Sequence, residues 1–167
     1  MSAWRHVRAV LLLPGGVTVI VPTLILWRTG MDVGWGLPDG FALLSVLLGV
    51  ALIGIGLGLV VWTVRLFATV GQGTLAPWDS TSRLVVRGPY RHVRNPMISG
   101  VACVLAGEAA LLGSVPLLLW FASVVAVNAF YLPLVEEPGL RRRFSEEYDV
   151  YRANVRRWVP RLRAWDL

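Results

Sequence analysis

The stretch 95–135 limits what this chain can fold into more than any other feature. Its forty-one residues include a single acidic or basic side chain, Glu108. A transmembrane helix needs about 20 apolar residues, so this stretch is too long for one span and suits two. Residues 113–116 (Gly-Ser-Val-Pro) provide a turn, because serine caps helices and proline is tolerated in a first turn. We therefore expect a helical hairpin with spans at 96–112 and 116–135.

Two more apolar stretches predict spans at 9–27 and 40–64. The chain of 167 residues is 56% hydrophobic and 16% charged, whereas about a quarter of the residues in a soluble domain are charged. We therefore expect an all-α, multi-pass integral membrane protein, a single domain with about four transmembrane helices. Helix-breaking residues predict that the first of these helices is irregular: Pro14, Gly15, Gly16 and Pro22.

The second span contains three closely spaced glycines, Gly54, Gly56 and Gly58. A glycine-rich run can bind phosphate where it follows a strand and opens a helix, but this run lies inside an apolar helix. Close packing between helices is the better interpretation. Such a glycine-rich surface would also permit a homodimer.

All sixteen basic residues are arginines, and their distribution predicts the topology. The loop 65–95 contains five arginines against one acid, the tail after residue 135 contains eight, and the turn at 113–116 contains none. By the positive-inside rule, the N-terminus, this loop and the C-terminus are cytoplasmic. The net charge of +6 comes without a recognition motif, so we expect no nucleic-acid partner. One cysteine and two distant histidines, His6 and His92, predict no metal site.

The tail predicts an amphipathic helix at 138–158. Its apolar residues recur every three or four positions, as on one face of a helix. They are Leu140, Phe144, Tyr148, Tyr151, Val155 and Trp158. Such a helix either lies on the membrane surface or packs over the cytoplasmic ends of the spans.

Ionisable residues gather at two places on the predicted cytoplasmic face. One is the arginine-rich segment 83–96, and the other is the pair Glu136 and Glu137 after the fourth span. The hairpin 95–135 brings both to one side of the membrane. Structural ion pairing would explain this cluster. A ligand site would also explain it, because carboxylates suit the ammonium and ribose hydroxyls of S-adenosylmethionine and arginine suits its carboxylate.

Glu108 lies inside the third span, where an acid is costly and indicates a function by default. We consider Glu108 and Asn128 as candidate catalytic residues, with Glu108 orienting a substrate amine or binding a proton. The alternative is a structural role, in which protonated Glu108 forms a hydrogen bond with Asn128 of the neighbouring helix.

Three motifs are more specific: GQGT at 71–74, LVVRGPYRHVRNPM at 84–97, and the ending EEPGLRRRFSEEYDVYRANVRRWVPR. With them, residues 66–161 resemble the isoprenylcysteine carboxyl methyltransferase family and its relatives, the membrane phospholipid methyltransferases. The resemblance implies S-adenosylmethionine as the cofactor and a helical membrane fold without a Rossmann domain. It also implies these cofactor-binding residues: Gln72, Ser82, Arg83, Leu84, Val85, Tyr90, Arg94, Asn95, Pro96, Met97, Ile98, Glu136 and Glu137.

Three residues depart from the pattern of that family. Asn95 replaces the usual histidine, Ile98 replaces a tyrosine, and Leu132 falls where the eukaryotic isoprenylcysteine enzymes place a substrate-handling arginine. The change at Leu132 argues against a prenylcysteine carboxylate as the methyl acceptor.

The sequence as a whole predicts a membrane methyltransferase that depends on S-adenosylmethionine. Its acceptor would be a lipid or another hydrophobic small molecule, methylated on an amine, a thiol or a carboxylate. One alternative is a family member that binds the cofactor without turnover. Another is a non-catalytic four-helix membrane protein, such as a transporter subunit or an assembly factor.

Overall fold

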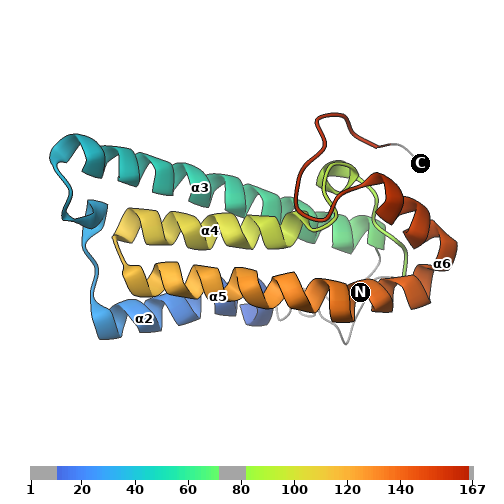
Figure 1. Cartoon of the computed structure of the whole chain (residues 1–167), viewed down its shortest axis with the longest axis horizontal. Coiled ribbons are helices and arrows are strands. Elements are labelled where there is room, and N and C mark those ends of the chain that lie inside the picture. The colour runs from blue at the N-terminus through green and yellow to red at the C-terminus, as the bar shows by residue number, and fades with distance from the viewer. Residues whose placement is uncertain (1–10, 72–81, 166–167) are drawn as a thin grey trace.

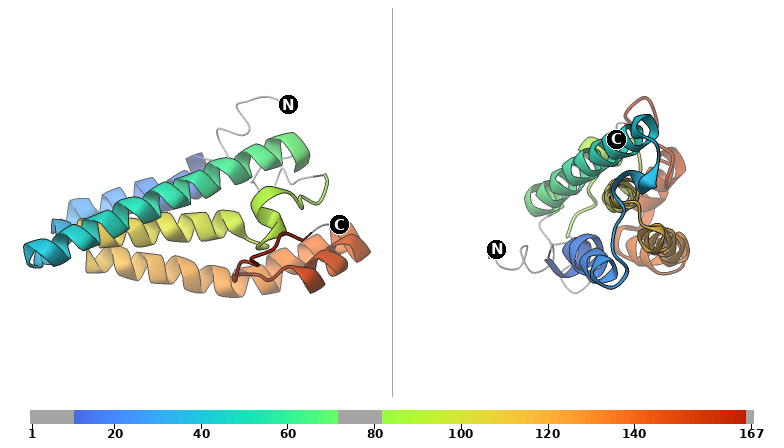
Figure 2. Two further views of the ribbon diagram at one scale, coloured as in Figure 1. Left: turned by 90° about the horizontal axis from the view of Figure 1, so that it is seen from above. Right: turned by 90° about the vertical axis from the view of Figure 1, so that its left-hand side faces the viewer.

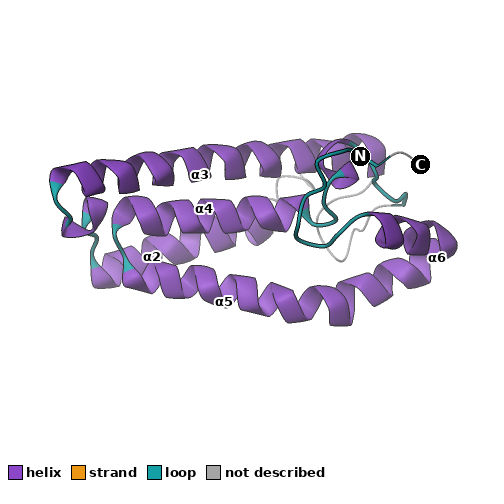
Figure 3. Cartoon of the chain, turned by 45° about the horizontal axis from the view of Figure 1, so that its top comes forward, coloured by secondary structure: helices purple, strands orange, loops and turns teal. Residues whose placement is uncertain are grey.

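A computed structural model describes residues 11–71 and 82–165 of the chain, and all their regular secondary structure is helical (Figure 3). In chain order the elements are η1 (Leu11–Ile20), α2 (Val21–Thr29), η2 (Val33–Gly36), α3 (Asp39–Leu66), η3 (Phe67–Gly71), η5 (Gly88–Arg91), α4 (Pro96–Leu112), α5 (Val115–Tyr131), η6 (Leu132–Glu136) and α6 (Glu137–Asn154). The η segments are π-helical or 3₁₀-helical turns.

Three helical stretches of the described residues are long and apolar enough to cross a membrane: Pro14–Gly36, Asp39–Gly71 and Val115–Asn154. The apolar part of the last stretch ends at Val135, before the charged helix α6. The fourth apolar helix, α4, has 17 residues, which corresponds to about 25 Å. The predicted all-α membrane fold is thus confirmed.

Apolar side chains on the outside of the bundle support the same conclusion. Both α3 and α5 expose large side chains to more than half of their full area, for example Phe41, Leu44, Ile55, Leu119, Val127 and Phe130. Water-soluble monomers rarely expose apolar patches on this scale. These surfaces therefore face the hydrocarbon of the bilayer.

The first span is irregular, as its prolines and glycines predict. η1 has wide π-helical turns around Pro14, whose ring nitrogen has no N–H for the usual helical hydrogen bond. The Trp120 indole donates to the Val17 carbonyl at 3.1 Å, and this bond ties η1 to α5.

Paired glycines bring α3 and α4 into backbone contact along antiparallel axes (Figure 1). A Cβ atom on Gly56 would lie 2.5 Å from the carbonyl oxygen of Gly100, and a Cβ on Gly107 would lie 2.7 Å from that of Gly49. On each helix the two glycines are seven residues apart, which is about two turns and returns to the same face. The sequence correctly predicted close helix packing through glycines, but of these four glycines it identified only Gly56.

Gly54 and Gly58 have no such role in the structure. A Cβ atom on either of them would meet nothing within 4 Å. Positions two apart on a helix differ by about 200°, so Gly54 and Gly58 point away from the face that Gly56 uses. The homodimer that these glycines would permit stays a prediction.

The hairpin between α4 and α5 forms as predicted. Gly113 adopts a left-handed conformation (φ 56°) that closes α4, and the Ser114 hydroxyl caps α5 by accepting from the N–H of Leu117 at 3.4 Å. Segment η2 covers this end of the bundle, opposite α6 (Figure 1). The Ala110 carbonyl, one of the last four of α4 and therefore without a helical partner, accepts from the indole of Trp35 at 3.1 Å and from the hydroxyl of Ser45 at 2.7 Å.

The tail differs from its prediction in length and in continuity. α6 ends at Asn154 instead of residue 158, and Ser145 leaves the helical conformation with φ 44° and ψ −121°. The chain then runs back beside the loop (Figure 2), where the N–H of Arg94 donates to the Arg156 carbonyl at 2.9 Å. These hydrogen bonds to the loop replace those that a longer helix would make, so an apolar period of three and four did not reveal where the helix stops.

Candidate active site

The apolar face of the tail packs against the loop that precedes α4. Tyr148, Tyr151 and Val155 are almost fully buried, and five partly buried apolar residues pack around them: Leu84, Val86, Leu140, Phe144 and Trp165. The Tyr151 hydroxyl donates to the backbone carbonyl of Tyr90 at 2.7 Å. Of the two interpretations of the tail, packing over the ends of the spans is therefore the one that the structure supports.

Glu137 holds the loop and the tail together. Its Oε1 atom lies 2.6 Å from Nε of Arg157 and 3.2 Å from Nη1 of Arg94, and its Oε2 atom lies 3.7 Å from Nε of Arg152. The Glu137 side chain is only 7% exposed. Desolvation raises the pKa of this carboxyl, but the hydrogen bond from Arg157 and the charges of Arg94, Arg157 and Arg152 outweigh it and lower the pKa. Glu137 thus forms structural ion pairs, and the cofactor contact expected of it stays a prediction.

Glu136, the adjacent carboxylate, has a different environment. Its carboxylate forms no hydrogen bond or ion pair with any residue in the described part of the chain. Burial and then the neighbouring charge of Glu137 raise its pKa. Two carboxylates whose pKa values are driven apart are typical of functional sites. Glu136 is therefore the member of the pair that is free to bind a ligand.

Tyr90 lies in the same surroundings. Its side chain is 7% exposed and its ring packs against that of Phe67, with 5.7 Å between the ring centroids. Burial, then the Tyr151 phenol and the Glu136 carboxylate, raise the pKa of Tyr90 well above its ordinary value. Tyr90 therefore stays protonated and presents a neutral hydroxyl on the Glu136 side of the loop.

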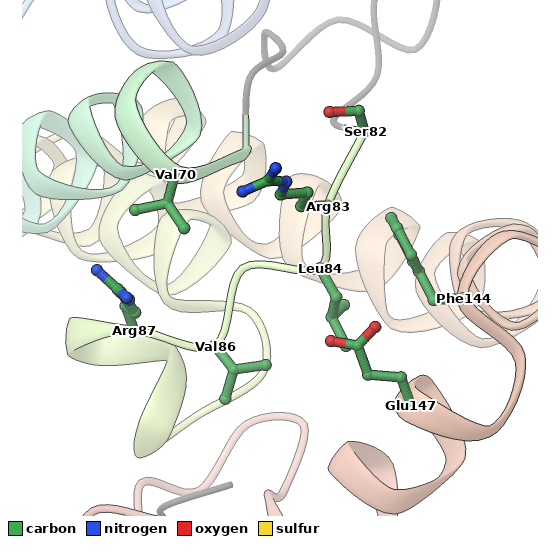
Figure 4. A pocket seen from close by; sticks show the side chains of 8 residues that line it. All are labelled: Val70, Ser82, Arg83, Leu84, Val86, Arg87, Phe144 and Glu147. Atoms are coloured by element: carbon green, nitrogen blue, oxygen red, sulfur yellow. The ribbon is translucent and has the colours of Figure 1, made fainter.

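A pocket of about 390 Å³ lies between the loop and the tail (Figure 4). Such a volume is within the range of small-molecule sites, about 300–1,000 Å³. Its walls are partly apolar and partly charged, and the lining residues are Val70, Ser82, Arg83, Leu84, Val86, Arg87, Phe144 and Glu147.

A buried donor also lacks a partner at this end of the bundle. The Nε atom of Arg94 has no hydrogen-bond acceptor within the described residues, although the rest of the guanidinium contacts Glu137 and the Tyr148 hydroxyl. An unsatisfied buried donor costs about 1–3 kcal/mol. An acceptor oxygen placed beside this atom would remove the cost.

Comparison with protein families decides what kind of protein has this arrangement. The phospholipid methyltransferase family model matches residues 44–147, from the second turn of α3 into α6. The chain belongs to the phospholipid methyltransferase family. Comparison with curated proteins and with solved structures gave no match. The resemblance seen in the sequence is confirmed, and the helical bundle is that of a family of membrane methyltransferases, which generally use S-adenosylmethionine as the methyl donor.

The structure brings only some of the expected cofactor residues of this methyltransferase into one cavity. Ser82, Arg83 and Leu84 line the pocket. Val85 is buried in the loop, and Gln72 lies outside the described residues. The other expected residues do not line this pocket and lie at the end of the loop, in the first turn of α4 and at the junction of η6 with α6: Tyr90, Arg94, Asn95, Pro96, Met97, Ile98, Glu136 and Glu137.

Asn95, which replaces the usual histidine of the family, holds the tail in place. Its side-chain nitrogen donates to the Arg157 carbonyl at 3.4 Å, and its own carbonyl accepts from the Ser99 hydroxyl at 3.1 Å. An amide can make this contact without a charge. Asn95 therefore joins the start of α4 to the same tail residue that Glu137 binds.

Glu108 and Asn128 are not brought together. Asn128 donates to the Val124 carbonyl of its own helix, and one carboxyl oxygen of Glu108 has no partner among the described residues. Counted from the hairpin turn, Glu108 comes five residues before Gly113 and Asn128 fourteen residues after Ser114, so they differ by about 13 Å in height. The hairpin register therefore excludes the hydrogen bond considered from the sequence, and a catalytic role for either residue stays a prediction.

Two charged residues of the pocket, Arg87 and Glu147, were not expected from the sequence. Arg87 lies within the matched loop motif, but Glu147 is sixty residues away on the tail. Only the return of the tail over the loop places them in one pocket. Nothing in the sequence spacing of Arg87 and Glu147 indicates that they share a pocket, because that depends on how the tail folds back.

Proposed function

We propose that this chain transfers a methyl group from S-adenosylmethionine to a lipid or another hydrophobic small molecule. The pocket between the loop and the tail is the observation that supports this proposal most directly. It contains three of the residues that the family resemblance assigns to the cofactor, and it has the size and the mixed polarity that a nucleoside linked to an amino acid requires.

Within this proposal, Glu136 holds a cationic or hydroxyl group of the cofactor, because its carboxylate, unlike that of Glu137, has no partner in the described ranges. Arg94 offers its free Nε donor to a cofactor oxygen. The bound cofactor supplies an electrophilic methyl group on a sulfonium. The chain supplies alignment and a dry site, and the buried tail residues Tyr148, Tyr151 and Val155 exclude water from one side.

The acceptor is proposed to enter from the bilayer. The outward faces of α3 and α5 are apolar and α4 begins directly after the loop, so a molecule with acyl chains can approach the site without leaving the membrane. The arginine-rich loop and tail are then cytoplasmic, where S-adenosylmethionine is available. An amine, a thiol or a carboxylate on the acceptor would each require a deprotonated nucleophile and little else.

Binding of S-adenosylhomocysteine, measured by calorimetry on detergent-solubilised protein, tests this function. We expect saturable binding in the wild type and at least a tenfold weaker affinity in Glu136→Gln, which loses one charge-assisted contact. Glu146→Gln is the matched control, since Glu146 is an exposed glutamate of α6 outside the pocket. Wild-type protein that is folded but binds nothing, in lipid nanodiscs as well as in detergent, would contradict the proposal.

A further inference from the structure

Three charged side chains of the pocket are left unpaired. Arg83, Arg87 and Glu147 all line it, and none of their charged side-chain groups forms an ion pair or a hydrogen bond with another residue in the described ranges. Some of the neighbouring charges are paired. Three arginines contact Glu137, and Arg141 pairs with Asp149 at 3.0 Å.

The arrangement of these three side chains separates positive from negative charge. In Figure 4 the guanidinium groups of Arg83 and Arg87 lie on the side of Val70, and the carboxylate of Glu147 comes from the tail and lies beside Leu84. The loop thus contributes the cations and α6 contributes the anion. Opposite charges that line one pocket without pairing leave both signs available to a ligand.

We propose that this pocket binds the amino acid end of S-adenosylmethionine. Arg83 and Arg87 receive its carboxylate, and Glu147 receives its ammonium group. The identity of the ligand rests on the proposed function, whereas the choice of residues rests on the pocket. A guanidinium matches a carboxylate with parallel N–H donors, and a carboxylate accepts from an ammonium.

A simple anion, such as the phosphate of a lipid headgroup, fits this pocket less well. Arg83 and Arg87 alone would attract it, but the carboxylate of Glu147 would repel it. An α-amino acid group carries both charges on one carbon atom and complements all three side chains. The sign pattern of the pocket therefore favours the zwitterion.

The assignment is tested by comparing two ligands that differ only in the amino acid end. S-adenosylhomocysteine has it, and 5′-methylthioadenosine lacks it. The protein is kept in dodecyl maltoside, a detergent without phosphate, so that lipid headgroups cannot occupy the arginines. The variants are Arg87→Gln and Glu147→Gln, and exposed residues of α6 outside the pocket provide the controls Arg142→Gln and Glu146→Gln.

We expect each pocket variant to bind S-adenosylhomocysteine about tenfold more weakly than the wild type. Affinity for 5′-methylthioadenosine should be the same in wild type and variants, and the controls should match the wild type for both ligands. All four positions are exposed, so near-ultraviolet circular dichroism should confirm the native fold in each case.

The outcomes separate this assignment from the proposed function. If the wild type binds S-adenosylhomocysteine and both pocket variants bind it equally well, the assignment is wrong and the proposed function stands. If the wild type binds both ligands with equal affinity, the amino acid end is not recognised and the assignment is also wrong. If the folded wild type binds neither ligand, the proposed function fails, and the assignment fails with it.

Discussion

Replacing Glu137 with glutamine is expected to release the tail from the loop. The carboxylate is 7% exposed and the Arg94 side chain is 10% exposed, so the variant leaves a buried guanidinium without its counter-charge. Removing one partner of a buried ion pair costs about 3–5 kcal/mol. Arg157 is 26% exposed and Arg152 is 49% exposed, so solvent weakens their attraction to Glu137. The total loss of stability should therefore lie near the lower end of that range, at about 3 kcal/mol.

Limited trypsin digestion measures how often the tail opens, because trypsin cleaves after arginine and the tail contains several arginines. When opening is fast compared with cleavage, the cleavage rate follows the population of the open form. A loss of about 3 kcal/mol then corresponds to about a hundredfold faster cleavage of the tail, at 1.4 kcal/mol for each factor of ten. Asp149→Asn is the matched control, since it breaks the exposed Arg141–Asp149 pair and should change the rate less than about fivefold.

Equal cleavage rates for Glu137→Gln and Asp149→Asn would refute this reasoning. The dependence on pH gives a second check, because the pKa of Glu137 is lowered in the folded chain. A group with a lowered pKa stabilises the fold fully above its unfolded pKa, about 4.3 for glutamate, and loses this effect as the pH falls through the folded value. The difference in thermal stability between wild type and Glu137→Gln should therefore shrink below about pH 4.

Two further predictions concern the membrane helices. Gly56→Ala should destabilise the bundle by about 1–3 kcal/mol, because its Cβ would meet the Gly100 carbonyl oxygen at 2.5 Å. Gly54→Ala meets nothing within 4 Å and should be neutral or stabilising. Unfolding by added sodium dodecyl sulfate compares the two variants, and equal effects would count against the glycine contact. Glu108→Gln should keep wild-type affinity for S-adenosylhomocysteine, because Glu108 lies about 18 Å along α4 from Pro96; calorimetry checks this, and a tenfold loss would place Glu108 in the cofactor site.

The spans and the hairpin could be predicted because each depends on local chemistry. Apolar length fixes a membrane helix, and a serine cap beside glycine and proline fixes a turn. Register between helices is different. Gly49 and Gly107 contact each other only because α3 and α4 run antiparallel at one particular offset. The sequence of neither helix determines that offset, so the glycine contact between α3 and α4 could not be predicted from the sequence.

The tail shows the same limit in another form. Its apolar period correctly marked the residues that pack, including Tyr148, Tyr151 and Val155. The period could not show that Ser145 interrupts the helix or that the chain turns back after Asn154. The turn back depends on hydrogen bonds between the tail and loop residues about sixty to seventy positions earlier. A helical pattern shows which face of a segment is apolar, but the length of the helix depends on the segment against which it packs.

The two adjacent glutamates show why the candidate site was only half visible in the sequence. Consecutive helical residues point about 100° apart, so Glu136 and Glu137 cannot share one environment. Ion pairing and ligand binding were alternatives for the pair. The structure shows ion pairing for Glu137, and ligand binding by Glu136 stays a proposal. Arg157 of the returning tail makes the difference, because its Nε atom reaches Glu137 at 2.6 Å and has no contact with Glu136. A substitution at Glu137 should therefore appear first as loss of stability, and one at Glu136 as loss of affinity in a protein that is still folded.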